Sequence, residues 1–230
     1  MNPWSTPGTV AGFVQSPPNA MLLQFAERER TAAAGPRLLD IGSGAARNAL
    51  PLARSGWRVL GTDTSWPMLE AAAARAHGED GLDRRGRGRG EGALHLAAAA
   101  MDRLPVQDRS VDLIVAHGIW NLARSSEEFR RSVREAARAA RPGAGLFLFT
   151  FSRNTLPPEA EPVAGEPFVF TQFSGQPQCF LTSEQIAEEL GSAGFAPDGA
   201  LPLRELNRPR GMLGAGSGPV IYEGTFRFTA

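Results

Sequence analysis

Four residues in one short stretch, Asp40, Gly42, Gly44 and Asp63, have the types and spacing of a cofactor-binding site. The two glycines follow an apolar segment, and a glycine turn lets a ligand lie against the backbone because no side chain holds it away. Asp63 closes a second apolar segment about 20 residues after the turn, where an acid can accept hydrogen bonds from both hydroxyls of a ribose. The pattern predicts a site for a nucleoside cofactor.

A βαβ unit is expected to position these residues. An apolar strand from Leu38 runs into the glycine turn, residues 45–54 favour a helix, and residues 57–60 form a second strand that Asp63 closes. Pro51 lies within the expected helix and removes one helical hydrogen bond, which leaves the start of that helix open. The unit places the turn and Asp63 at the same edge of a parallel sheet.

The residues around the turn distinguish between cofactors. A dinucleotide fingerprint requires a third glycine where this chain has Arg47, and an acid directly before the glycines, Asp40, suits a ligand with an ammonium and a sulfonium group. Leu39-Asp40-Ile41-Gly42-Ser43-Gly44 resembles the first motif of class I S-adenosylmethionine (SAM) methyltransferases. The continuation to Ala49 is similar to small-molecule members such as the tellurite-resistance type. By motif, the resemblance covers about residues 36–152.

The resemblance implies an α/β fold: a doubly wound, seven-stranded, mostly parallel sheet with an antiparallel C-terminal hairpin. We expect one domain over residues 1–230. Its parts are an N-terminal arm and helix at 1–35, a cofactor-binding core at 36–152, a substrate lid at 153–180, and a helix and hairpin at 181–230. Residues 1–18 read as an irregular arm, and Ser16 with Pro17 predicts a helix that runs to about Ala34.

The resemblance also implies which residues contact the cofactor. Asp40, Gly42 and Gly44 are expected at its methionine end and Asp63 at the ribose. A strand over 93–101 would place Asp102 at the adenine amino group, and the backbone of His117 would follow the fourth strand. The expected cofactor contacts are Asp40, Gly42, Gly44, Asp63, Thr64, Met68, Met101, Asp102 and His117.

His117 is the candidate catalytic residue, because the end of the fourth strand faces the transferring methyl group. A general base is needed only when the acceptor is protonated at neutral pH, and packing or a backbone contact would also account for this histidine. The expected substrate pocket is partly aromatic and comprises Trp4, Phe13, Arg47, Trp120 and Phe151. Three histidines and one cysteine show no metal-ligand spacing, so no metal is expected.

The amino-acid composition limits the classes of partner that the protein is expected to bind. Lys plus Arg and Asp plus Glu both number 24 among 230 residues, so the zero net charge does not favour nucleic acid or an anionic membrane. The arginine- and glycine-rich stretch at 77–92 lacks interleaved aromatics and is interpreted as a solvated loop rather than an RNA-binding segment. A single cysteine, no signal peptide and no long apolar run predict a cytoplasmic protein. The expected partner is a small-molecule substrate; the oligomeric state is left open.

Three other functions are alternatives to small-molecule methylation. A nicotinamide-dependent oxidoreductase would need the missing third glycine. A macromolecular methyltransferase would need a basic face or a recognition domain, and neither is evident in the sequence. A non-catalytic SAM-binding or scaffold protein would keep the same motifs, and only turnover would exclude it.

Overall fold

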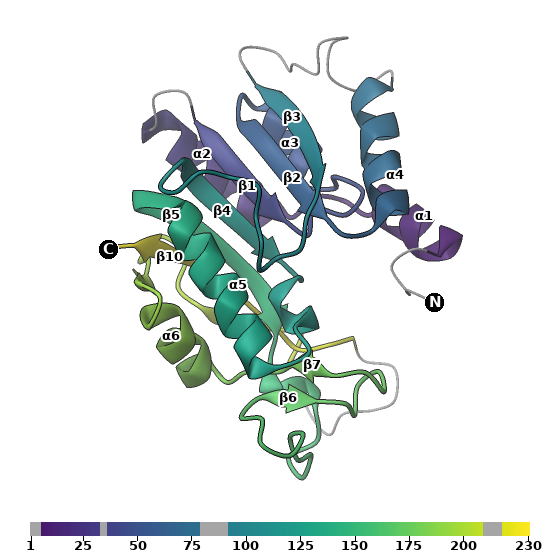
Figure 1. Ribbon diagram of the computed structural model, residues 1–230, viewed down its shortest axis with the longest axis vertical. Helices are drawn as coiled ribbons and strands as arrows, with labels where there is room; N and C mark the ends of the chain where they lie inside the picture. Colours follow the sequence, from purple (N-terminus) through teal and green to yellow (C-terminus); the bar gives the residue numbers. More distant parts are fainter. Residues whose placement is uncertain (1–5, 33–35, 79–91, 209–217) are drawn as a thin grey trace.

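A computed structural model describes residues 6–32, 36–78, 92–208 and 218–230, and it shows a central sheet with helices on both faces (Figure 1). The sheet order is β3-β2-β1-β4-β5-β10-β8, and β9 also pairs with β10. The first five strands are parallel: β1 (Arg37–Ile41), β2 (Arg58–Asp63), β3 (Ala93–Ala98), β4 (Val111–His117) and β5 (Ala140–Phe151).

The expected mostly parallel α/β fold is confirmed, but the strand count differs. Over the residues that the structure describes, the sheet has eight strands rather than seven. Both β8 (Phe195–Pro197) and β9 (Arg204–Leu206) lie antiparallel to β10 (Ile221–Phe228), along different parts of its length. The β9–β10 pair is the predicted hairpin, and residues 209–217 of its connection lie outside the described residues.

Successive side chains of a strand point to opposite faces of the sheet, so the hydrophobic core is divided into two parts, one on each face. Leu38 packs with α2 (Ala20–Ala32), α3 (Ala49–Arg54) and α4 (Trp66–His77), whereas Leu39 packs on the opposite side. That second side is covered by α5 (Ser126–Ala139) and α6 (Ser183–Gly191). In Figure 1, α5 lies in front of the sheet and α3 behind it.

The N-terminal segment differs from its prediction. Residues 7–15 form a helix, α1 (Pro7–Gln15), where an irregular arm was expected, because Thr6 caps it and Pro7 occupies its first position. The next helix begins at Ala20 rather than Pro17. Asn19 caps it, with its side-chain oxygen accepting from the Leu22 amide at 3.0 Å. The substrate-pocket candidate Trp4 lies outside the described residues.

Two boundaries in the cofactor-binding core are also corrected. The helix after the glycine turn begins at Ala49 instead of Ala45, so Pro51 stands in its first turn, where no helical hydrogen bond is lost. β3 ends at Ala98, three residues before Met101, because the chain turns at 101–102 instead of continuing the strand. Most of the loop predicted at 77–92 lies outside the described residues.

The segment at 153–180 is not only a surface loop. It contains η3 (Arg153–Thr155), β6 (Val169–Phe170) and β7 (Gln178–Cys179), the last two paired as a small separate sheet. Phe168, Val169 and Cys179 are buried in the same core as α5. The segment is therefore anchored at its apolar residues, and a lid role remains a prediction. No helix in the described part of the chain is long and apolar enough to span a membrane.

Candidate functional site

The glycine turn after β1 has a backbone that only glycine adopts without strain. Gly42 has φ +68° and Gly44 has φ +53°. A Cβ on Gly42 would stand 2.6 Å from Cδ1 of Ile119. A Cβ on Gly44 would meet Phe13 at 3.7 Å and Met68 at 3.8 Å. The turn is thus closely surrounded by α1, α4 and the segment after β4.

Replacing Gly42 by alanine is expected to lower the free energy of unfolding by about 2–4 kcal/mol, because φ strain and a steric clash with Ile119 add together. Gly118 is a matched control. Its φ is +71°, but a Cβ there meets nothing within 4 Å. Gly118→Ala should lower the free energy of unfolding by only about 1–2 kcal/mol, because only the φ strain applies there. Urea unfolding of both variants measures these losses of stability. If the two variants lose equal free energy of unfolding, the clash with Ile119 makes no contribution.

Asp63 links the turn to the next helix. Its carboxylate accepts from the backbone amide of Gly44 at 2.9 Å and from that of Ser65 at 2.7 Å. One side chain at the end of β2 therefore fixes both the glycine turn and the start of α4. A carboxylate has about four acceptor positions, so two remain for a ligand.

Asp40 is buried, and its Oδ2 has no hydrogen-bond partner in the described structure. Burial raises the pKa of Asp40 to about 7; the Arg47 charge opposes this rise, and the Asp63 charge adds to it. A buried carboxylate with an unpaired oxygen is costly unless a donor reaches it. The ammonium group of an amino-acid ligand would supply such a donor, so Asp40 fits the cofactor that the sequence predicts.

His117 lies at the carboxyl end of β4 and points to the face covered by α2. Its ring stacks on Phe149, with ring centroids 4.0 Å apart. An Arg47 guanidinium nitrogen lies 3.2 Å from Nδ1, and the Asn19 side-chain nitrogen lies 3.3 Å from Nε2. Burial, reinforced by the Arg47 charge, lowers the pKa of His117 to about 3. The ring is therefore neutral at physiological pH.

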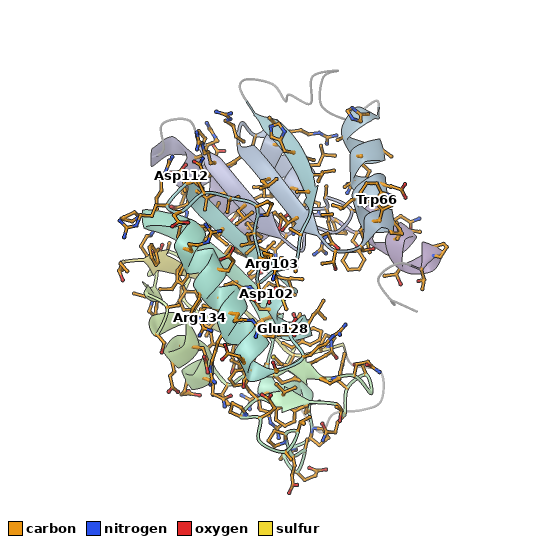
Figure 2. The ribbon with its side chains drawn as sticks, viewed as in Figure 1. Trp66, Asp102, Arg103, Asp112, Glu128 and Arg134 are labelled. Carbon is orange, nitrogen blue, oxygen red and sulfur yellow. The ribbon has the colours of Figure 1, made fainter. Side chains whose placement is uncertain are left out.

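The remaining predicted cofactor contacts lie around the same edge of the sheet with different exposure. Met68 is buried, Thr64 is exposed and Met101 is half-buried. Asp102 forms an ion pair with Arg131 of α5 at 3.3 Å. Figure 2 shows Asp102 beside α5, whereas Trp66 projects from α4 and is 64% exposed. The adenine contact of Asp102 remains a prediction.

The predicted substrate residues do not form one cluster. Arg47 joins His117, and Phe13 lies over the glycine turn. Trp120 is buried in the main core, its ring centroid 6.1 Å from that of Phe129. Phe151 belongs instead to an aromatic group with Phe173, Phe180 and Phe170.

Two residues at the site were missed by sequence reasoning. Asn19 donates from its side-chain nitrogen to Glu223 at 2.8 Å, and its backbone amide donates to Asn48 at 2.9 Å. Glu223 is buried in β10 and also pairs with Arg204 at 3.0 Å. A single acid within residues 220–226, which are otherwise uncharged, was a usable signal. Among the described residues, no group of three or more His, Cys, Asp or Glu is arranged to hold a metal ion.

Comparison with known proteins agrees with this geometry. A family model described as a methyltransferase domain matches residues 39–148. This match, together with the fold, supports a class I SAM-dependent methyltransferase. The resemblance predicted from the glycine turn is thereby confirmed, and SAM is the cofactor. The narrower resemblance to the tellurite-resistance type stays a prediction.

The sequences of named relatives match part of this chain. A demethylmenaquinone methyltransferase of Streptomyces avermitilis is 25% identical over 176 residues, covering 70% of this chain and 68% of that protein. One from Clavibacter sepedonicus is 30% identical over 125 residues, or 54% of this chain, and the match spans only 44% of that protein.

Solved structures share the fold. A SAM-dependent methyltransferase of Methanosarcina mazei has a TM-score of 0.67 at 17% identity, covering 93% of this chain and 99% of that one. The 1,6-didemethyltoxoflavin N1-methyltransferase of Burkholderia thailandensis, solved with S-adenosylhomocysteine, has a TM-score of 0.62 at 17% identity and covers 92% and 79%.

Proposed function

We propose that the enzyme transfers the methyl group of SAM to a small, largely apolar acceptor. The observation that carries the proposal is the carboxyl edge of the sheet, where buried Asp40 with an unpaired oxygen, the glycine turn and Asp63 lie together. Asp40 would hold the ammonium group and Asp63 the ribose. When bound, SAM would supply an electrophilic methyl group, and an acceptor atom held in line would form a bond to the methyl carbon as the carbon–sulfur bond breaks and S-adenosylhomocysteine leaves.

The chain itself contributes position and shielding from water. Holding the reacting groups in line can contribute about 7–11 kcal/mol to lowering the barrier. Phe13 covers the turn from α1, and Arg47 carries a positive charge beside Asp40. A ring whose pKa is about 3 is a poor proton acceptor at neutral pH, so we assign His117 to orienting the site instead of to general-base catalysis.

An aromatic surface supports an apolar acceptor. Phe151 ends β5 at the same edge of the sheet as His117, and Phe173 lies against it with ring centroids 5.3 Å apart. Phe173 is 46% exposed, so part of this aromatic group is accessible. The relatives named for methylating demethylmenaquinone act on an acceptor of this general kind.

Labelled SAM tests the proposal directly. The protein is incubated with methyl-labelled SAM and a panel of acceptors that includes demethylmenaquinone, other flat apolar alcohols and amines, and, separately, protein, RNA and DNA. Label transfer to an apolar small molecule supports the proposal. Transfer only to a macromolecule, or SAM binding without transfer to any acceptor, would contradict it.

Removing the exposed ring tests the acceptor surface. Phe173→Ala is expected to raise the KM for the acceptor roughly tenfold, because burying an aromatic ring contributes about 1.5–3 kcal/mol. The dissociation constant for S-adenosylhomocysteine should not change. Val163→Ala, at a 38% exposed residue of the same segment, is the control and should leave both constants unchanged. Equal effects of the two substitutions would argue against an aromatic acceptor surface.

A further inference from the structure

Helix α4 contacts the glycine turn along its length and not only at its start. The Met68 sulfur would lie 3.8 Å from a Cβ on Gly44, and a guanidinium nitrogen of Arg75 donates to the backbone carbonyl of Ala45 at 2.7 Å. Met68 and Arg75 are about two helical turns apart, so their side chains lie on the same face of α4. That face of the helix therefore packs against the turn.

Arg75 is half-buried, and its partner is a carbonyl instead of a carboxylate. Burial, followed by the Arg54 charge, lowers the pKa of Arg75, and no acid among the described residues opposes this change. A guanidinium remains charged and only donates, so its bond to Ala45 is a charge-assisted hydrogen bond. The charge of Arg75 thus acts on the backbone of the glycine turn.

The peptide unit that receives this bond is held at both of its polar ends. The carbonyl of Ala45 accepts from Arg75, and the amide of Ala46 donates to the Ser43 carbonyl at 3.0 Å. Of these two bonds, the one from Arg75 comes from outside the turn. Rotation of the peptide unit would break both bonds.

Ala46 is strained by the conformation that these bonds fix. Its φ is +56°, in the left-handed region that Gly42 and Gly44 also adopt, but alanine carries a Cβ. This conformation costs free energy in a residue other than glycine and persists only where the surrounding structure imposes it. Without the bond from Arg75, we expect the turn to relax at Ala46.

We propose that Arg75 is a positioning residue of the cofactor site: by holding the Ala45 carbonyl, it keeps Ala46 left-handed and the glycine turn in the shape that receives the methionine end of SAM. Arg75 acts through the backbone and needs no contact with the cofactor. The proposal rests on the proposed function for the place of the methionine end, and it is independent of the acceptor.

The ribose end of the cofactor should depend less on Arg75. The Asp63 carboxylate accepts from the Ser65 amide at 2.7 Å as well as from the Gly44 amide, and Ser65 lies outside the turn. Relaxation of the turn therefore leaves Asp63 one of its two anchors. The two ends can be probed separately, because 5′-methylthioadenosine has the adenine and ribose but lacks the amino-acid part.

Isothermal titration calorimetry of Arg75→Met with both ligands tests the proposal. S-adenosylhomocysteine should bind about tenfold more weakly than to the parent protein, the effect of about one charge-assisted hydrogen bond, whereas the affinity for 5′-methylthioadenosine should change by less than about threefold. Arg75→Lys keeps a charged donor on a flexible stem and should retain most of the affinity for S-adenosylhomocysteine. Arg75→Gln, with a shorter uncharged side chain, serves if the methionine variant does not fold.

Arg227→Met is the matched control. Arg227 also donates to the carbonyl of a left-handed residue, Gly143, at 3.0 Å, and it pairs with Glu29 at 2.5 Å. Gly143 lies near the amino end of β5, away from the glycine turn. Arg227→Met should lower the melting temperature and leave the affinities for both ligands unchanged.

The outcomes separate the role of Arg75 from the placement of the cofactor. Arg75 has no positioning role if Arg75→Met weakens both ligands equally or neither, if Arg75→Lys binds S-adenosylhomocysteine no better than Arg75→Met, or if Arg227→Met shows the same selective loss. If the parent protein binds the two ligands equally tightly, the methionine end does not lie at the turn. That result would overturn this part of the proposed function together with the role of Arg75.

Discussion

Asp63→Ala is expected to weaken binding of S-adenosylhomocysteine by roughly 100-fold or more. Each hydrogen bond to a charged group contributes about 1.5–3 kcal/mol, and the proposed ribose contact has two. The same substitution frees the Gly44 and Ser65 amides, which Asp63 holds at 2.9 and 2.7 Å, so the turn itself loosens. Isothermal titration calorimetry measures the change directly.

Asp112 supplies a control carboxylate of the same kind. It accepts from the Arg37 amide at 2.9 Å and from Arg141 at 2.7 Å, and it lies near the other end of β4 from His117 (Figure 2). Asp112→Ala should lower the melting temperature yet leave the affinity for S-adenosylhomocysteine unchanged. If both variants lose affinity equally, the effect of Asp63 is on folding, and the ribose contact is not supported.

Asp40→Asn is expected to stabilise the ligand-free protein at high pH while weakening cofactor binding. The pKa of Asp40 is raised from 3.8 to about 7 by burial. The native state therefore holds a proton that the unfolded state has released, and stability falls as pH rises from about 4 to about 7. Removing the carboxyl group removes this loss, which amounts to about 4 kcal/mol above pH 7.

Urea unfolding of the parent and of Asp40→Asn between pH 4 and 8 checks the sign. The difference between them should grow with pH up to about 7 and then stay constant. Cofactor binding by the parent below pH 7 should release a proton, because an ammonium group beside Asp40 favours the carboxylate. Calorimetry in buffers of different ionisation enthalpy detects that proton. A pH-independent difference in stability would remove Asp40 from this role.

The sequence was most informative where chemistry depends on consecutive residues. The order Asp40-Ile41-Gly42-Ser43-Gly44 determines a local turn, because glycine alone adopts its positive φ angles without strain, and this predicted the family and the cofactor. The capping box from Thr182 to Gln185, which opens α6, likewise depends only on near neighbours in the sequence.

Tertiary structure decided which distant residues surround that turn. Asn19, His117 and Glu223 meet only because β10 pairs antiparallel with β5 and α2 packs beside it, and no local pattern specifies either contact. The same reason applies to Asp102, whose partner Arg131 lies on α5. Burial then sets the charge states of Asp40 and His117, because desolvation depends on everything packed around a group and not on its neighbours in sequence. The sequence therefore determined the cofactor, and the fold decided the protonation states and partners of the residues that receive it.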